Sequence, residues 1–441
     1  MSPASLHMTK KPRWRAPAVA AVLLLALASP VTPDASAHAR GQHRHSAASV
    51  LSWNATASDA LALDAKFGPP LVFVGISYVQ AAVYNAVVGV EGGYEQYKWH
   101  ARAHHGTSVD AAVAAAAHRM LLTYAPAAQV RVDAAYATAL AAIPDGWAKD
   151  AGISFGERAA AHIVALRTGD GWMAAIPFTM APAPGIWRPT DSHTPAGFLP
   201  FAAPWLGEMR PFLLHSHDQF RPSGPRSLTS AGYARDLNEV KAIGSATSTT
   251  RTDLQTEIAH LFGDNNFAVQ LQGAFRDHLT RHPHGIVWAA RYLAGADLSA
   301  ADAAISSWDA KFVYGSWRPI TAIQLADTDG NPATVADPTW QPLIVTPNHP
   351  DYLSGHTTVS GAVTTALTQL TGTSRIDLNM PSPTNLTLPT RHYEWAGQLN
   401  AESIGARIWA GIHTRTADEV GNRVGKRVGA FGMRHYFHAT D

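Results

Sequence analysis

Long alanine-rich segments with helical apolar spacing run through most of this chain and constrain its fold more than any other feature. Their apolar residues recur three and four positions apart, and the alternation typical of half-buried strands is almost absent. The sequence therefore predicts an all-α protein, a helical bundle with long ordered loops. The segments expected to be helical are 71–90, 108–124, 129–143, 147–167, 229–243, 250–264, 266–282, 299–317, 356–370, 393–411 and 417–436.

Residues 170–228 differ from these segments because prolines and tryptophans recur there without periodicity. A linker between independent domains is one interpretation, but tryptophan and phenylalanine favour packing over flexibility. We therefore expect a long ordered loop that lies over helices and lines a site. The expected organisation is a flexible lead-in at 38–50 followed by a single domain over 51–441.

The N-terminus has the pattern of a secretory signal peptide over residues 1–37. Basic residues within 10–15 precede the apolar run 18–28, and 35–37 (ASA) offers small residues for cleavage. The apolar run is short for a bilayer span, and no other stretch is expected to reach transmembrane length. We expect a secreted protein without stable membrane association; a retained N-terminal anchor is the alternative.

The charge balance and the lack of cysteine exclude several classes of function. The chain has 34 Lys and Arg against 33 Asp and Glu, which is not the balance of an electrostatic nucleic-acid binder, so we expect no nucleic acid partner. It contains no cysteine. Disulfides, cysteine nucleophiles and thiolate-bound metals are therefore excluded.

Three short fragments near the C-terminus together contain what is needed to bind one tetrahedral oxyanion. They are 311–319 (KFVYGSWRP), 354–356 (SGH) and 407–413 (RIWAGIH), and none of them contains a carboxylate. A phosphate-like anion needs fixed positive charge, forked guanidinium donors and a backbone that can approach closely. The residues that meet these needs are Lys311, Arg318, Ser354, Gly355 and Arg407, together with the two histidines His356 and His413.

The fragments are expected at helix ends. A helix would place Lys311 and Arg318 on one face, with Arg318 at its end because the following proline cannot continue it. Ser354 would open a helix whose exposed N–H groups attract an anion. Gly411 would end a helix and let His413 turn back toward the same centre. Each fragment alone is weak evidence, whereas all three in order are a strong signal.

In combination the fragments resemble the signature of the vanadium-dependent haloperoxidase and type 2 phosphatidic acid phosphatase superfamily, which is KxxxxxxRP, then (P)SGH, then (S)RxxxxxH. Their surroundings, WRPITAI, NHPDYLSGH and GIHTRTADEVG, are more similar to the soluble bacterial vanadium haloperoxidases. The resemblance extends upstream through RTDLQTEIAHLF, which begins at Arg251, and through 81–86. It implies a helical bundle of the haloperoxidase and acid phosphatase type, with the active site within 308–418.

The resemblance also implies a cofactor, substrates and residue roles. Vanadate would be the cofactor, and hydrogen peroxide would oxidise halide to hypohalous acid, which halogenates a small organic substrate. His413 would bind vanadium(V), and His356 would act as general acid–base toward peroxide. Lys311 would polarise the peroxide. The residues implied to hold the vanadate oxygens are Lys311, Arg318, Ser354, Gly355 and Arg407.

Two further positions match those that flank the halide in the family, Trp308 and His349. A histidine at the second position is the bromoperoxidase type, so bromide is the expected halide. The chain departs from the signature at Leu353 and Ala406, neither of which would contact the anion. It also has Ala417 where the family has an aspartate, which leaves Asp418 as the candidate to orient His413.

Two alternative functions remain open at this point. A phosphatase would use the same residues, with His413 as nucleophile and His356 as the acid that protonates the leaving alcohol. An inactive oxyanion-binding protein would keep the site without turnover. The surroundings of Trp308 and His349 favour the haloperoxidase.

Overall fold

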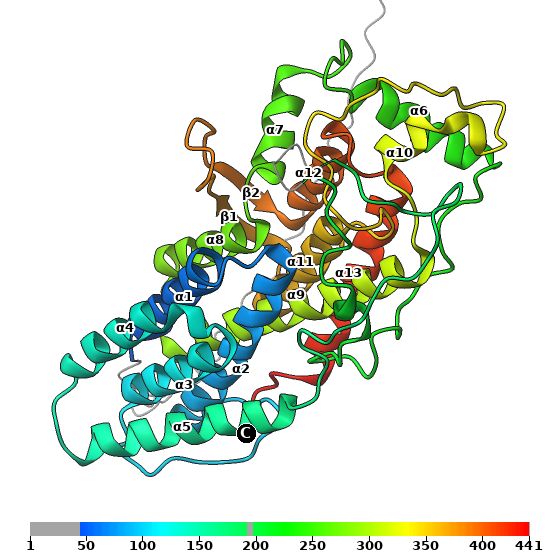
Figure 1. The fold of residues 1–441 in the computed structure, drawn as a ribbon. Helices are drawn as coiled ribbons and strands as arrows, with labels where there is room; N and C mark the ends of the chain where they lie inside the picture. Colours follow the sequence, from blue (N-terminus) through cyan, green and yellow to red (C-terminus); the bar gives the residue numbers. More distant parts are fainter. Residues whose placement is uncertain (1–44, 192–196, 441) are drawn as a thin grey trace, which may run out of the picture. The chain divides into compact units, whose positions relative to one another are not determined.

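The computed structural model describes residues 45–191 and 197–440, and within them the regular secondary structure is almost entirely α-helical (Figure 1). The all-α prediction is confirmed. In chain order the α-helices are α1 (Ala48–Asp59), α2 (Pro69–Glu91), α3 (Val109–Tyr124), α4 (Gln129–Ala141), α5 (Trp147–Arg167), α6 (Ala231–Ile243), α7 (Asp253–Gly263), α8 (Phe267–Arg281), α9 (Ile286–Tyr314), α10 (Pro319–Gln324), α11 (Gly355–Thr371), α12 (Ala396–Trp409) and α13 (Arg415–His435).

Helices with clear caps begin within three residues of their predicted starts, whereas larger differences occur at α9 and at residues 393–395. Ser108 caps α3 by accepting from the N–H of Ala111. α9, expected from residue 299, begins at Ile286 after Gly285, so its first turns were missed. Residues 393–395 were expected to be helical but lie in β2 (Arg391–Trp395), which pairs antiparallel with β1 (Arg375–Met380).

The predicted N-terminal segments lie mostly outside the described residues. The signal peptide at 1–37 and residues 38–44 of the lead-in belong to this part of the chain. Residues 48–50, also assigned to the lead-in, form the first turn of α1. The lead-in prediction is therefore wrong for these three residues.

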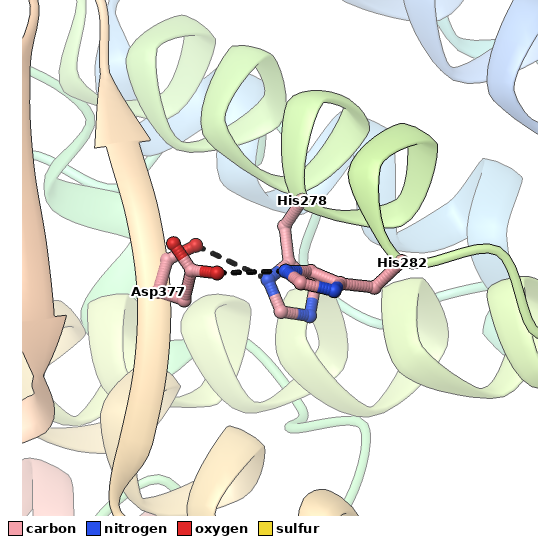
Figure 2. Close-up of side chains that lie close together, drawn as sticks. All are labelled: His278, His282 and Asp377. Atoms are coloured by element: carbon pink, nitrogen blue, oxygen red, sulfur yellow. Dashed lines mark hydrogen bonds and ion pairs between the residues drawn. The ribbon is translucent and has the colours of Figure 1, made fainter.

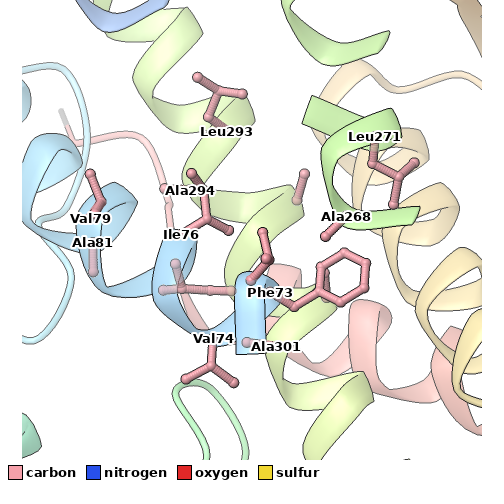
Figure 3. Packing of buried hydrophobic residues seen from close by; sticks show 14 of the residues in the cluster. Phe73, Val74, Ile76, Val79, Ala81, Ala268, Leu271, Leu293, Ala294 and Ala301 are labelled. Atoms are coloured by element: carbon pink, nitrogen blue, oxygen red, sulfur yellow. The ribbon is translucent and has the colours of Figure 1, made fainter. Parts of the chain in front are cut away.

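The helix α2 lies at the centre of the hydrophobic core. Figure 3 shows its side chains Phe73 and Ile76 against α9 and α8, where Ala294 and Ala268 lie. By length and composition α2 is apolar enough to cross a membrane, which corrects the expectation that no such stretch follows the N-terminus. However, 94% of its most apolar window is buried within the protein. The composition of α2 is therefore that of an interior helix.

The described residues of the Trp- and Pro-rich segment, 170–191 and 197–228, form mostly irregular structure, and contacts of residues 212–221 attach the segment to α9. Asp302 on α9 accepts hydrogen bonds from three consecutive backbone N–H groups, those of residues 212–214, at 2.6–2.8 Å. Two turns further along α9, Asp309 accepts from the guanidinium of Arg221 and from His217. These buried carboxylates accept hydrogen bonds from donors of a loop that has few backbone–backbone hydrogen bonds of its own.

Helices α11 and α13 pack closely because α13 presents a row of glycines to α11. A Cβ added to Gly425 would lie 1.9 Å from the carbonyl oxygen of Thr358, and one added to Gly429 would lie 2.3 Å from that of Ala362. Only glycine permits this approach of the two backbones. The packing brings the first turns of both helices together, and these turns carry Ser354 and Asp418.

Candidate functional site

The oxyanion residues predicted from the sequence come together at the ends of several helices. Lys311 lies in the last turn of α9, Ser354 is the N-cap of α11, and Arg407 lies in the last turn of α12. Gly411, with φ +78°, turns the chain after α12 and places His413 just before α13. We call this group, together with Arg318, Gly355 and His356, the oxyanion site.

The expectation that Lys311 and Arg318 share one helix face is wrong. Helix α9 ends at Tyr314, because Gly315 takes a left-handed conformation, and Arg318 is the N-cap of the short helix α10. The two cations therefore reach the site from different elements. Because the helix is interrupted between them, the side chain of Arg318 enters the site from a direction that a continuous helix would not allow.

The side chain of His413 is held by Asp351. Its Nδ1 atom lies 2.6 Å from Oδ1 of Asp351, while Oδ2 of the same carboxylate accepts from the hydroxyl of Thr414 at 2.6 Å. If Nδ1 carries the proton and donates to the carboxylate, Nε2 is left with a free lone pair. This Nε2 atom faces Arg318, whose Nη1 lies 3.0 Å away. The role proposed for Asp418 is thus filled by Asp351.

Arg318 makes most of its contacts with backbone and imidazole acceptors, so much of its guanidinium group is already hydrogen-bonded. Nε donates to the carbonyl of His349 and Nη1 to the carbonyl of Ile412, both at 2.6 Å. Nη2 lies 2.9 Å from Nδ1 of His349. These bonds fix the guanidinium between the loop before α11 and the loop before α13.

Lys311 is fully buried and also binds the loop before α11. Its Nζ donates to the carbonyl of Pro350 at 2.6 Å and to that of Asp351 at 3.1 Å. The ammonium group thus positions the same residue whose carboxylate holds His413. A buried ammonium with only carbonyl acceptors lacks a full counter-charge.

Five buried side-chain atoms of the site have no hydrogen-bond partner within the described part of the chain. They are Oγ of Ser354, Nε2 of His356, Nε of Arg407 and both carboxylate oxygens of Asp418. Leaving a buried polar atom unpaired costs about 1–3 kcal/mol, and a fold rarely tolerates several together without a ligand. The Ser354 hydroxyl and the guanidinium N–H can donate to the oxygens of a tetrahedral oxyanion, and the imidazole nitrogen can accept from a protonated oxygen.

The electrostatics of the site also favour an anion. Burial lowers the pKa of Arg318 to about 9 and that of Arg407 to about 10. Burial and the charge of Arg318 lower the pKa of Lys311 well below its usual value. Such shifts mean that the positive forms are disfavoured in the protein alone. A bound oxyanion would offset this cost, so the residues fit vanadate or phosphate.

His356 is positioned to exchange a proton. Its ring stacks on Phe267, with centroids 4.8 Å apart, and the nearby backbone carbonyl of Phe262 partly opposes the lowering of its pKa by burial. That carbonyl accepts from Nη1 of Arg407 at 3.2 Å. Burial, then the charge of Arg407, lowers the pKa of His356 well below its usual value. The imidazole is therefore neutral, and its unpartnered Nε2 can accept a proton.

The two residues assigned to the halide lie together beside the oxyanion site. The rings of Trp308 and His349 have centroids 4.8 Å apart, and His349 is 6.5 Å from His413. A Cβ on Gly355 would approach Trp308 Cζ3 to 3.0 Å. Glycine at this position therefore gives the indole room against the first turn of α11.

Asp418 lies in the site but near Ser354 and Arg407 instead of His413. Burial raises its pKa well above the usual value, and the nearby hydroxyl of Ser354 and the charge of Arg407 oppose this shift. The hydroxyl and the carboxyl do not reach hydrogen-bond geometry. Asp418 thus adds a carboxyl to the wall behind Ser354.

Two functional contacts were missed by the sequence analysis, those of Asp351 and Phe262. Asp351 lies two residues after His349 and three before Ser354, so its position between two candidate residues was a usable signal. Phe262 acts through its backbone carbonyl, which every residue has. No residue type could have revealed it.

Comparison with known proteins agrees with this geometry. Residues 291–440 match the family model described as the VCPO second helical-bundle domain. The fold is similar to a bacterial vanadium-dependent iodoperoxidase, with TM-score 0.76 and 22% identity over 89% of this chain and 97% of that chain.

Two crystal structures of bacterial vanadium-dependent chloroperoxidases are also similar. The apo-type structure has TM-score 0.67 and 15% identity over 83% of this chain and 94% of that chain. The holo-type structure has TM-score 0.66 and 17% identity over 84% and 93%. No curated protein sequence matches. Residues 291–440 therefore match the model of the VCPO second helical-bundle domain, and the chain has the fold of these vanadium-dependent haloperoxidase structures.

Proposed function

We propose that this protein is a vanadium-dependent haloperoxidase, which oxidises halide with hydrogen peroxide and halogenates a small organic substrate. The observation that carries the proposal is the set of unpartnered atoms on Ser354, His356 and Arg407 beside three buried cations. Similarity to iodo- and chloroperoxidase structures supports it. Bound vanadate would supply a Lewis acid that activates peroxide toward halide without changing its oxidation state.

The residues of the site divide this work among themselves. Nε2 of His413, which lies 3.0 Å from Nη1 of Arg318, is the nitrogen that would bind vanadium, since Nδ1 is engaged by Asp351. Lys311, Arg318 and Arg407 would offset the charge of the vanadate oxygens, with further bonds from the Ser354 hydroxyl and the Gly355 N–H. Nε2 of His356 would take a proton from incoming hydrogen peroxide.

Halide would lie against Trp308 and His349, which a hydrogen bond from Arg318 to His349 keeps beside the oxyanion site. Bromide is the halide we propose, because a histidine occupies this position. The assignment is open to direct comparison of chloride, bromide and iodide.

An apolar organic substrate has a candidate position close by. A cavity of about 470 Å³ is formed by the segment 170–228, and its lining includes Phe178, Trp187 and Phe201. Its volume lies within the usual range for ligand pockets. The residue after Phe201, Ala202, accepts a hydrogen bond from the indole of Trp308 at 2.9 Å. This hydrogen bond therefore connects the wall of the cavity to Trp308, which flanks the proposed halide position.

Export of the protein is part of the proposal and rests on the signal-peptide pattern of residues 1–37. Mass spectrometry of protein recovered from culture medium should find an N-terminus at His38. Recovery of the uncleaved chain in the membrane fraction would contradict it.

The central experiment measures binding and turnover separately. Orthovanadate should raise the unfolding temperature of the purified protein, since a ligand at 100 times its Kd stabilises by about 2.7 kcal/mol. The reconstituted protein should then halogenate a phenolic dye with peroxide and halide. Arg407→Met should lose the thermal shift, because it removes the unpartnered guanidinium.

A parallel assay distinguishes the alternatives. Efficient release of phosphate from a monoester by the vanadate-free protein, with no halogenation under any halide, would show a phosphatase. Tight vanadate binding without either activity would show an oxyanion-binding protein. Each of these results would overturn the proposed function.

A further inference from the structure

A second cluster of ligand-type side chains lies between α8 and β1, and none of its members belongs to the oxyanion site. His278 lies in the last turn of α8 and His282 is the C-cap of the same helix, and their ring centroids are 4.8 Å apart. Figure 2 shows both imidazoles directed at Asp377 on the neighbouring strand. One ligand atom from each residue lies within 4.8 Å of the other two. We propose that these three side chains bind a divalent transition-metal ion of the zinc class.

The donor set suits this class of ion. Two imidazoles and a carboxylate are a common zinc ligand set, with water completing a tetrahedron. Nε2 of His282 is 2.7 Å from Oδ2 of Asp377, whereas two ligand atoms of a tetrahedral zinc ion are roughly 3.4 Å apart. Admission of the ion therefore requires these two atoms to separate by less than about 1 Å, which rotation of the half-exposed His282 side chain can supply.

A backbone contact holds the second imidazole in place. Nδ1 of His278 lies 3.2 Å from the backbone carbonyl of Asp377, and its ring stacks on Tyr292 with centroids 5.3 Å apart. A hydrogen bond from one ring nitrogen to a carbonyl is the usual way in which a metal-binding imidazole is oriented. Nε2 is then the nitrogen available to the ion.

The conformation of Asp377 is unusual and directs two oxygen atoms to the histidines. Its φ is +44°, in the left-handed region that few residues other than glycine adopt. It lies where the pairing of β1 and β2 shifts register, between Arg375 and Leu378. As a result both its carboxylate and its carbonyl reach α8.

Arg281 now occupies part of the space that the ion would take. Its Nη1 donates to Oδ2 of Asp377 at 2.8 Å, and its Nη2 donates to the carbonyl of the same residue. It also has a second partner, because Nε donates to Asp277 at 2.8 Å. The metal ion would take the place of the Arg281 guanidinium at Asp377, and Arg281 would keep its bond to Asp277. This competition makes Arg281 the most informative residue to change.

The ion would connect the β1–β2 hairpin to α8. The first residue of α8, Phe267, stacks on His356 of the oxyanion site. The proposed metal site does not depend on the function proposed for that site. Its test uses metal binding and unfolding, not halogenation.

The experiment measures zinc binding to the full-length protein, freed of metal, by titration calorimetry and by thermal unfolding with zinc chloride. We expect the wild type to bind one more zinc ion than His282→Gln, and zinc to raise its unfolding temperature. The affinity of His282→Gln should be lower by at least about tenfold. Because the chain has 22 histidines, zinc can also bind elsewhere. The test is therefore the difference in zinc binding between the wild type and the variants.

A matched control is His260→Gln. His260 also pairs with an aspartate four residues away, Asp264, at 3.0 Å, but no third ligand among residues 45–191 and 197–440 accompanies them. The His260→Gln variant should bind as much zinc as the wild type, with the same affinity. Equal zinc binding by the wild type, His260→Gln and His282→Gln would overturn the proposal.

Arg281→Gln separates a metal site from a purely structural ion-pair network. Removal of the competing guanidinium should lower stability without zinc and raise zinc affinity by several-fold. The cobalt(II) form should show the intense visible absorption of a four-coordinate ion, and His278→Gln should weaken it. Loss of stability in Arg281→Gln with no gain in zinc affinity would show that Asp377 serves only as an ion-pair partner.

Discussion

The Nδ1 atom of His413 lies 2.6 Å from Oδ1 of Asp351, and this contact determines which nitrogen of the imidazole faces the oxyanion site. Asp351→Asn would place an amide there, which can hydrogen-bond to Nδ1 without favouring the required tautomer. Because partners that orient a metal ligand typically contribute 10–100-fold in affinity, we expect vanadate affinity to fall by about that factor. Calorimetric titration with orthovanadate measures it, and Asp418→Asn, which does not touch His413, should have a smaller effect. The reverse order would contradict the assignment.

The same contact predicts a pH dependence. Burial raises the pKa of Asp351 to about 6, against the charges of Arg318 and Lys311. Above this pH the carboxylate is ionised and accepts from His413; as the pH falls through about 6 it becomes protonated and the acceptor is lost. Vanadate affinity should therefore fall below pH 6 more steeply in the wild type than in Asp351→Asn. Parallel affinity profiles would show that another group is responsible.

His356→Ala should separate binding from turnover. The unpartnered Nε2 of His356 is a proton acceptor, and the three cations and His413 remain in the variant. Loss of a general acid–base typically costs 10²–10⁴-fold, so we expect kcat to fall by about that factor while vanadate affinity changes little. Steady-state halogenation and calorimetry measure the two quantities. Unchanged turnover would refute the acid–base role.

Phe178→Ala tests whether the aromatic cavity binds the organic substrate. Phe178 lies at the centre of an aromatic group, 5.7 Å from Trp187 and 5.2 Å from Phe201 between ring centroids. Its loss should raise KM for a bulky apolar substrate and leave halide oxidation, followed with a small acceptor, unchanged. Phe198→Ala is the control, because Phe198 is 69% exposed. Equal halogenation by the two variants would indicate that freely diffusing hypohalous acid does the halogenation.

Asp297→Asn should change how stability depends on pH. Burial raises the pKa of Asp297 from 3.8 to about 7, opposed by a hydrogen bond from Gln272. A raised pKa stabilises the folded protein fully at low pH, and this contribution is lost as pH rises from about 4 to about 7. In urea unfolding, the free energy of unfolding of the variant should rise relative to that of the wild type across this range, by on the order of 4 kcal/mol. The exposed Asp327→Asn should show no such change. If the difference in the free energy of unfolding between Asp297→Asn and the wild type does not vary with pH, the prediction is wrong.

Gly425→Ala tests the close packing of α11 and α13. The added Cβ would lie 1.9 Å from the carbonyl of Thr358, so the helices must separate. We expect a loss of about 3 kcal/mol in the free energy of unfolding, at the upper end for overpacking, and weaker vanadate binding because α11 carries Ser354. Gly397→Ala is matched to it, since nothing lies within 4 Å of that Cβ. It should stabilise α12 by about 0.5–1 kcal/mol, and equal destabilisation by both changes would refute the packing argument.

Much of the fold was predictable because helix signals are local. The spacing of apolar residues and the cap at Ser108 gave α3 its bounds, and α5 runs from Trp147 to Arg167 as expected. The strand β2 was not predictable in this way. Its hydrogen bonds are made to β1, about fifteen residues earlier, and its short apolar pattern also suits the start of a helix.

The chemistry of the oxyanion site was determined by the sequence alone, because cations, a hydroxyl and imidazoles at helix ends are properties of residue types and local spacing. Only the tertiary structure decided which groups meet. It assigned Asp351 rather than Asp418 to His413, and it placed the carbonyl of Phe262 between His356 and Arg407. These contacts join residues 62 to 145 positions apart. Their geometry depends on the packing of α7, α11, α12 and α13, for which no local sequence signal exists.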